Sequence, residues 1–106
     1  MRRGEIYWAS LPPPAGRRPV LVVTGDGAIP YLTKVTVAPV TRTVRGIRSE
    51  VALGRTEGLA TESVANCHNL ETILKTAFDA VPIGRLRRSN IHQLDRALRF
   101  ALGIRS

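Results

Sequence analysis

The stretch Pro19-Val20-Leu21-Val22-Val23-Thr24 is an unbroken run of leucine and β-branched residues between a proline and a threonine. A run of this kind, with no polar interruption, is typical of a strand that is buried on both faces. The turn sequence Gly25-Asp26-Gly27 follows it directly, and prolines and a glycine precede it. We therefore expect a central strand, against which the rest of the chain packs.

The segment Gly4–Ser10, on the N-terminal side of this run, alternates between apolar and polar residues. The alternation predicts a half-buried strand with Ile6 and Trp8 on one face and Glu5 and Tyr7 on the other. The three prolines that follow cannot continue a strand ladder, so residues 11–16 are expected to form a stiff loop.

Several segments on the C-terminal side also favour strands. Alternation from Leu32 to Val40 puts Val35 and Val37 on the face opposite to Lys34 and Thr36. Many short strands with Gly and Pro between them indicate a small antiparallel barrel or a sandwich. The further expected strands are Ser49–Leu53, Ser63–His68, Glu71–Leu74 and Val81–Leu86.

The last part of the chain has apolar residues at helical spacing. Ser89 is the expected N-cap, and Gly103 is the expected residue just beyond the C-terminal end. No linker, repeat or low-complexity tract interrupts the chain, so we predict one domain over residues 1–106. Its fold class is mainly β, a compact barrel with a C-terminal amphipathic helix. The expected apolar face is Ile91, Leu94, Ala97, Leu98, Ala101 and Leu102, and the polar face is His92, Asp95, Arg96 and Arg99.

The charge of the chain is strongly positive. Sixteen Lys and Arg residues against eight Asp and Glu give a net charge of +8, and only Lys34 and Lys75 among the cations are lysines. Arginine binds phosphate and carboxylate through a planar, bidentate fork. The composition therefore favours a polyanionic partner: a nucleic acid, an acidic protein or an anionic membrane surface.

The same composition excludes several classes of protein. No apolar run approaches the length of a membrane-spanning helix, and no signal peptide is recognisable. The single cysteine, Cys67, cannot form an intrachain disulfide. We therefore expect a soluble cytoplasmic protein with no membrane association.

Two basic clusters are candidate binding sites. Gly16-Arg17-Arg18-Pro19 places two guanidiniums at the mouth of the central strand, and Pro19 biases Arg18 toward an extended backbone. Ala38-Pro39-Val40-Thr41-Arg42-Thr43-Val44-Arg45-Gly46 places hydroxyls and cations alternately after a strand, which suits contacts with phosphates. Taken alone, the first cluster is more typical of solvated loop charges, and the second is also compatible with an ordinary strand-end loop. As phosphate-binding residues we predict Arg17, Arg42, Thr43 and Arg45.

Adjacent Cys67 and His68 suggest a metal site or a thiolate pair, but neighbours on a strand point to opposite faces. No second cysteine is present, and His92 lies on the expected helix, so a zinc site would lack ligands. No phosphate-cradling GxxxxGK, GxGxxG or nucleophile elbow occurs either. We therefore predict no metal site and no cofactor, and we expect His68 to be a hydrogen-bonded histidine of the barrel.

Several segments, in matching order and spacing, resemble the MazF/PemK/Kid family of type II toxins. They are Arg3–Trp8, Arg17–Val23, Ala38–Thr41, Glu62–Val64 and Ile83–Leu86, so the resemblance covers nearly the whole chain. The segment after Thr41 is similar to the mycobacterial and other actinobacterial members.

This resemblance implies an SH3-like barrel, a homodimer and an acidic antitoxin partner. It also implies a metal-independent, sequence-specific endoribonuclease that cleaves single-stranded RNA. The family's catalytic pair, an Arg before the Pro-Val strand and a Thr after the third strand, corresponds to Arg18 and Thr41, and a substrate-contacting amide corresponds to Asn69. The sequence departs from the family at Glu71, where several members carry a basic residue.

Two other functions fit the composition and the barrel pattern equally well. One is a non-catalytic basic barrel that binds RNA, and the other is a toxin of the same fold directed at DNA gyrase, as CcdB is. The pairing of the Arg18-Pro19 junction with Thr41 favours the nuclease.

Overall fold

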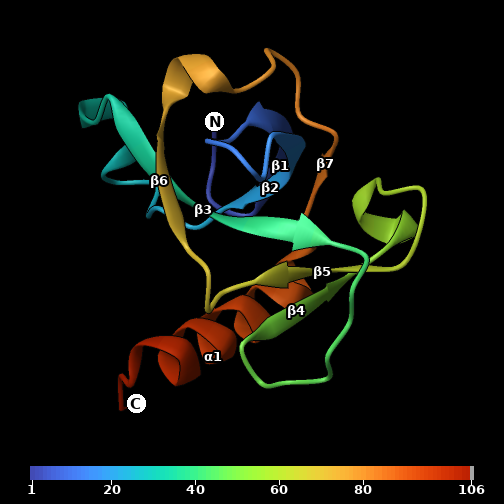
Figure 1. Ribbon diagram of the computed structural model, residues 1–106. Helices are drawn as coiled ribbons and strands as arrows, with labels where there is room; N and C mark the ends of the chain where they lie inside the picture. The colour runs from blue at the N-terminus through green and yellow to red at the C-terminus, as the bar shows by residue number, and fades with distance from the viewer. Residues whose placement is uncertain (106) are drawn as a thin grey trace.

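The fold is known from a computed structural model that describes residues 1–105. Its regular elements are seven strands, four short 3₁₀ turns and one α-helix (Figure 1). The strands are β1 (Glu5–Ser10), β2 (Arg17–Val22), β3 (Lys34–Thr41), β4 (Glu50–Leu53), β5 (Ser63–Asn66), β6 (Glu71–Leu74) and β7 (Gly84–Arg85); the 3₁₀ turns are η1 (Ile29–Tyr31), η2 (Arg55–Glu57), η3 (Lys75–Ala77) and η4 (Arg88–Asn90); the helix is α1 (Ile91–Leu102).

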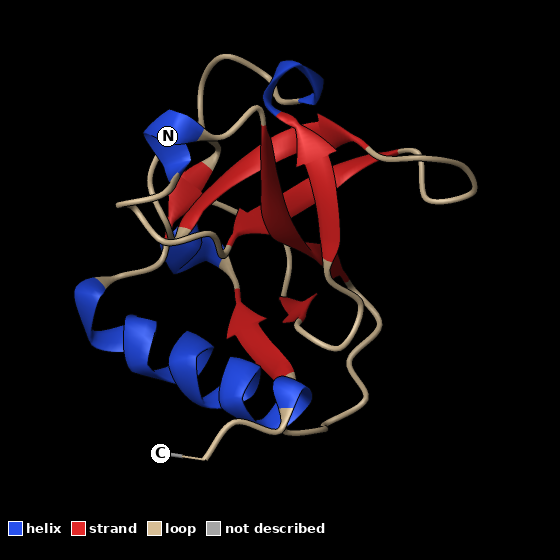
Figure 2. Cartoon of the chain, turned by 90° about the vertical axis from the view of Figure 1, so that its left-hand side faces the viewer, coloured by secondary structure: helices blue, strands red, loops and turns tan. Residues whose placement is uncertain are grey.

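The strands form one curled antiparallel sheet in the order β4-β5-β3-β2-β1-β7, with β6 also paired to β3. The long β3 joins the two halves of the sheet, because it pairs with β2 and β6 along its first part and with β5 at its end. Helix α1 lies across the open end of the curl (Figure 2). The predicted mainly β fold, an antiparallel barrel with a C-terminal helix, is confirmed.

The strand ends differ from the expected ones where a turn begins. The strand expected over residues 63–68 stops at Asn66, because the chain turns there and the Asn69 amide donates to the Asn66 carbonyl. The strand expected over residues 81–86 is reduced to the two residues of β7. Within residues 1–105, no helix is long and apolar enough to cross a membrane.

The central strand is buried on both faces, as its sequence predicts. Leu21 packs in one core cluster, against α1 and the β4–β5 hairpin, while Val20 and Val22 pack in a second cluster with β1 and η1. The expectation for β1 is wrong in part: Tyr7 is buried in the second cluster, and Trp8 is 42% exposed. The reason is that Tyr7 packs in the second core cluster, whereas Trp8 lines a surface groove.

Helix α1 packs mainly through Leu94 and Ala97, which are buried in the first cluster. Two details of the prediction are wrong. Leu102 is exposed because the helix extends beyond the sheet, and the N-cap position is Asn90, since η4 takes up Ser89. Gly103 does end the helix: its φ of +67° is the left-handed conformation, and its amide donates to Phe100 O.

The β4–β5 loop crosses β7 at two glycines. A side chain on Gly84 would collide with the carbonyl oxygen of Glu57, and a Cβ on Gly58 would lie 2.5 Å from the carbonyl oxygen of Ile83. Gly58 also has a φ of +93°, which only glycine adopts readily. Backbone therefore packs directly on backbone here, and this contact holds the loop in place.

Candidate functional site

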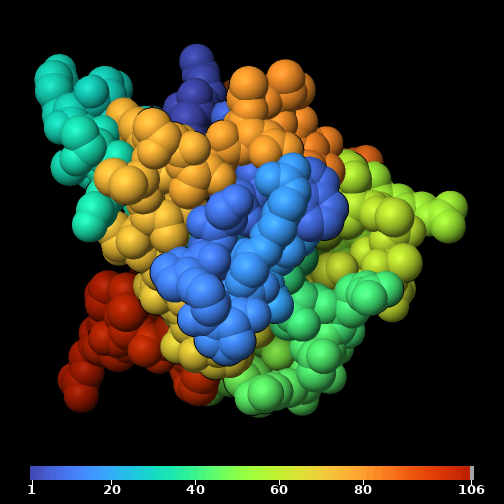
Figure 3. Space-filling model, turned by 45° about the horizontal axis from the view of Figure 1, so that its top comes forward, coloured from blue at the N-terminus to red at the C-terminus, as the bar shows by residue number. Residues whose placement is uncertain are grey.

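The Arg18 groove, a depression of about 450 Å³, lies at the end of the sheet where β2 begins and β3 ends. Figure 3 shows its surroundings: the β1–β2 loop in blue, with the β3–β4 loop in green below and the β4–β5 loop in yellow-green beside it. The groove is lined by Trp8, Arg17, Arg18, Pro19, Val40, Thr41, Arg42, Leu59, Ala60, Thr61 and Ser63.

Arg18 and Thr41 meet in this groove because of the register between β2 and β3. Val20 lies opposite Pro39, and the same register continued by two residues brings Arg18 level with Thr41. Both side chains line the groove, although they are far apart in sequence.

Arg18 lies on a strand rather than in a loop. Arg18 pairs with Ala9 of β1, and its side chain is half-buried. Its Nε atom is buried, and no acceptor from the described residues is within hydrogen-bond distance. A buried N–H without an acceptor is costly. An anionic oxygen within hydrogen-bond distance of Nε would relieve this cost.

The hydroxyl of Thr41 is positioned by its own loop. Thr41 Oγ1 accepts a hydrogen bond from the Thr43 amide at 3.1 Å. Because the oxygen serves as the acceptor there, the O–H hydrogen remains available to donate. Thr41 is half-buried at the edge of the groove, so that proton can point toward a bound anion.

Arg17 lines the same groove but already has a protein partner. Its guanidinium donates two hydrogen bonds to the Asp79 carboxylate, at 3.0 and 2.5 Å, and lies 5.4 Å from the centre of the Trp8 ring. The hydrogen bond from Arg17 lowers the pKa of the Asp79 carboxyl below its usual range. Both side chains are exposed, so a phosphate can still approach this pair.

The β3–β4 loop carries the remaining predicted basic residues. Arg42 is exposed and lines the groove, whereas Thr43 and Arg45 are exposed on the loop beyond it. The carboxylate of Glu50 accepts the amides of Arg45 and Gly46 at 2.9–3.2 Å and so gives the loop a defined shape.

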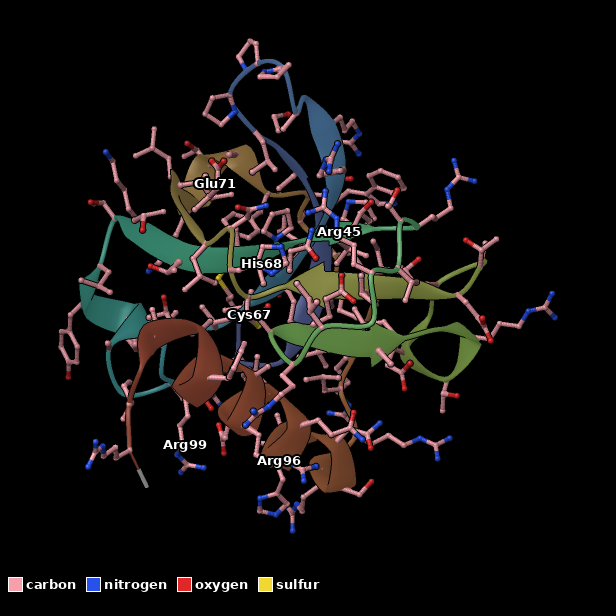
Figure 4. All side chains as sticks on the ribbon, turned by 60° about the horizontal axis from the view of Figure 1, so that its bottom comes forward. Arg45, Cys67, His68, Glu71, Arg96 and Arg99 are labelled. Atoms are coloured by element: carbon pink, nitrogen blue, oxygen red, sulfur yellow. The ribbon has the colours of Figure 1, made fainter. Side chains whose placement is uncertain are left out.

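Asn69 is outside the groove, exposed on the turn between β5 and β6. The Cys67 side chain next to this turn is buried in the core, and burial raises the pKa of its thiol to about 11. His68 is exposed, with Nδ1 2.7 Å from the Ser49 hydroxyl (Figure 4). The Cys67 thiol in the core and the exposed His68 ring are therefore separated. Within residues 1–105, no three His, Cys, Asp or Glu side chains gather into a metal-binding group.

Sequence reasoning missed part of the groove wall. Trp8, residues 59–61 and Ser63 line the groove, and Asp79 holds one of its arginines. Trp8 carried a signal, since a large aromatic side chain is suited to stacking on bases. Asp79 carried none, because it reaches Arg17 from 62 residues away in sequence.

Comparisons with known proteins show the family of the chain. Residues 2–102 match the family described as "PemK-like, MazF-like toxin of type II toxin-antitoxin system". Among curated proteins, the "Probable endoribonuclease MazF2" of Mycobacterium tuberculosis is 38% identical over 104 residues, which cover 97% of this chain and 99% of that protein.

Solved structures give the same result. The Mycobacterium tuberculosis toxin MazF-mt6 superposes with a TM-score of 0.88 at 37% identity, over 96% of this chain and 99% of that chain. A mycobacterial endoribonuclease in complex with its cognate antitoxin has a TM-score of 0.87 at 28% identity, over 100% of this chain and 98% of that one. This chain therefore belongs to the PemK-like, MazF-like toxins of type II toxin–antitoxin systems.

Proposed function

We propose that this chain is an endoribonuclease that cleaves single-stranded RNA in the cytoplasm at the Arg18 groove. One observation carries the proposal: the β2–β3 register brings a half-buried guanidinium and a hydroxyl together in a basic groove. The proposed activity is the one that the names of two relatives reported above give: both are called endoribonucleases.

The chemistry follows from what these two side chains can do. The 2′-hydroxyl of the substrate attacks the adjacent phosphorus, a P–O2′ bond forms, and the P–O5′ bond breaks. A proton leaves the 2′ oxygen and another is added to the 5′ oxygen, so the products are a 2′,3′-cyclic phosphate and a 5′-hydroxyl. Negative charge develops on the oxygens of the pentavalent phosphorus, where Arg18 and the Thr41 hydroxyl stabilise it.

The guanidinium of an arginine keeps its proton near neutral pH, so it cannot take up another and cannot serve as the base. Arg18 therefore acts through charge and hydrogen bonding. The substrate supplies the nucleophile, which restricts cleavage to RNA and requires no divalent cation. Arg17, Arg42, Thr43, Arg45 and Asn69 are proposed to contact the RNA without reacting.

The partners are proposed on the same basis. A mycobacterial relative is known as a structure in complex with its cognate antitoxin. The net charge of +8 would attract an acidic antitoxin segment, which could cover the RNA-binding surface. The toxin itself is proposed to be a homodimer, which light scattering at micromolar concentration would test: a monomer would contradict it.

The decisive experiment compares two RNA oligonucleotides in EDTA. One is all-ribose, and the other has a single 2′-deoxy sugar just 5′ of the cleaved phosphate. We expect the first to be cut, leaving a 5′-hydroxyl end, and the second to bind with little change but stay intact. Cleavage of the deoxy strand at the same bond would overturn the mechanism, and loss of all cleavage in EDTA would show a metal requirement. A protein that binds both strands and cuts neither would instead be the non-catalytic RNA-binding barrel.

A further inference from the structure

A second and larger groove, of about 820 Å³, lies beside β7, and we refer to it as the β7 groove. It is formed where the N-terminal segment, β7 with the residues before α1, and the start of the β4–β5 loop come together. Figure 1 shows β7 between β1 and that loop. Five exposed arginines from these three segments line the groove: Arg2, Arg55, Arg85, Arg87 and Arg88.

The ion pairs found within residues 1–105 are made by the N-terminus, Arg3 and Arg17. None of the five guanidiniums of the groove therefore has a carboxylate partner among these residues. The acidic residues of the groove are already used by the fold. Glu5 accepts from the Arg2 amide and the Tyr7 hydroxyl, Asp26 accepts from the Arg3 amide, and Glu57 accepts from the Gly54 amide. With six arginines and three carboxylates, the lining of the groove carries a net positive charge.

The chemistry of the lining favours phosphates over an acidic peptide. The large apolar side chains of the β7 groove, Leu86 and Ile91, are buried or half-buried, so the exposed side chains of its lining are charged or carry a hydroxyl. By contrast, the groove between α1 and β4 combines arginines with the exposed side chains of Phe100 and Ile104, which would suit an amphipathic peptide. Guanidiniums with no exposed large apolar side chain in the described lining fit a sugar–phosphate backbone.

The β7 groove is also close to the Arg18 groove along the protein surface. One loop, between β4 and β5, lines both: Leu59, Ala60 and Thr61 face the Arg18 groove, and residues 55–58 face the β7 groove. The glycine crossing at Gly58 and Gly84 fixes that loop between them. An RNA strand that crosses this loop from the Arg18 groove would reach the β7 groove.

We propose that the β7 groove binds the phosphate backbone of the RNA substrate outside the cleaved segment, and so favours long RNA over short oligonucleotides. This inference rests on the proposed ribonuclease function. An OB fold, a small barrel that binds single strands, covers about 4–16 nucleotides. A short substrate therefore occupies the Arg18 groove alone, whereas a long one reaches both.

The test uses two RNAs that share one cleavage site, mapped beforehand by sequencing the 5′-hydroxyl ends of a cleaved transcript. One is an oligonucleotide of about 8 nucleotides, near the lower end of the range for an OB fold. The other carries the same site within a long unpaired strand.

The variant is the triple substitution Arg85→Gln, Arg87→Gln and Arg88→Gln. On long RNA we expect kcat/KM to fall about tenfold or more, through KM, and the salt slope of binding to fall by about 2, since each lost contact with a single strand removes about 0.7.

A matched control removes the same charge from another surface. Arg96→Gln, Arg99→Gln and Arg105→Gln lie on and after α1, and Figure 4 shows Arg96 and Arg99 directed away from the sheet. This control is expected to cut both RNAs as the wild type does. Cleavage of the short RNA also reports whether the β7 variant is folded, because that reaction needs only the Arg18 groove.

Each outcome decides the proposal. Selective loss with long RNA in the β7 variant supports it. Unchanged cleavage of long RNA, or an equal loss in the control, would overturn it. If the β7 variant keeps its affinity for RNA but loses binding to polyglutamate, the groove is a site for an acidic protein and the proposal is wrong. If the wild type cuts neither RNA, the proposed function fails, and the affinity for long RNA, measured by fluorescence anisotropy, still tests the groove.

Discussion

The Arg18 groove and the β7 groove are both rich in arginine, but they hold their arginines differently. Arg18 is half-buried on a strand, and Arg17 beside it is held by two hydrogen bonds to Asp79. In the β7 groove most of the arginines lie at the chain start, in 3₁₀ turns or in the segment before α1, and all five are exposed without a carboxylate partner among residues 1–105.

The two arrangements of arginine suit two different tasks. Stabilising a transition state requires a donor at a fixed position, because a misplaced donor does not meet the charge where it develops. Binding a flexible phosphate backbone requires charge density and tolerates mobile side chains. The two grooves therefore fit chemistry and retention of the same RNA strand.

The largest expected effect comes from Arg18. Arg18→Ala should lower kcat on the short RNA by about 10²–10³, the cost of removing a donor to developing charge. Arg18→Lys should restore little, because a point charge does not replace a planar fork. Single-turnover kinetics measure this, with circular dichroism to confirm the fold and Arg99→Ala as the matched control. Near-wild-type cleavage by Arg18→Ala would remove the contrast between the two grooves.

Thr41→Val keeps the β-branched shape and deletes only the hydroxyl. A neutral hydrogen-bond donor contributes about 1.5 kcal/mol, so cleavage of the short RNA should slow about tenfold. Thr41→Ser, which retains the hydroxyl, should cut nearly as well as the wild type. If the valine variant cuts normally, Thr41 has no part in the reaction.

Gly84→Ala tests the crossing that separates the grooves. The added methyl group would meet the Glu57 carbonyl, so the free energy of unfolding should fall by about 1–3 kcal/mol, as for other overpacked sites. Gly25→Ala, at a glycine with open space around it, is the control for urea unfolding. Equal stability of the two variants would show that the loop is not held by this contact.

A smaller effect is expected at the loop that follows β3. Arg42→Gln and Arg45→Gln should each lower the slope of log affinity against log salt by about 0.7 for single-stranded RNA, with little change in the rate at saturation. Titration at several salt concentrations measures the slope. If neither slope changes, the RNA follows a different face of the protein.

The smallest effect is expected at Asp79, which partly neutralises Arg17. Asp79→Asn would free the guanidinium for phosphate and should raise the salt slope by up to about 0.7. Because the pKa of Asp79 is lowered, the wild-type carboxylate stays ionised until the pH falls below its usual range. The variant and the wild type should therefore differ at neutral pH and converge in acid, and a difference that persists in acid would contradict this role.

The local elements and the kind of partner are readable from the sequence alone. Alternation and apolar runs predicted the strands, because side chains on a strand alternate between its two faces. Helical spacing predicted α1, and the excess of arginine predicted a polyanionic ligand. These properties depend on neighbouring residues or on composition, so they can be read without the fold. Leu102 and Ser89 were misjudged because helix ends depend on what lies next to them.

How distant residues come together depends on the fold. The resemblance named Arg18 and Thr41 as a pair, and the register of β2 against β3 is what brings them to one groove. The second core cluster buries Tyr7, and the chain path brings Asp79 to Arg17. The β7 groove likewise collects Arg2, Arg55 and the arginines of residues 85–88 from three separate parts of the chain. Such meetings follow from hydrogen bonds and packing between segments that are not neighbours in sequence. No local pattern encodes them, because a strand of given polarity can pair in several registers until its neighbours choose one.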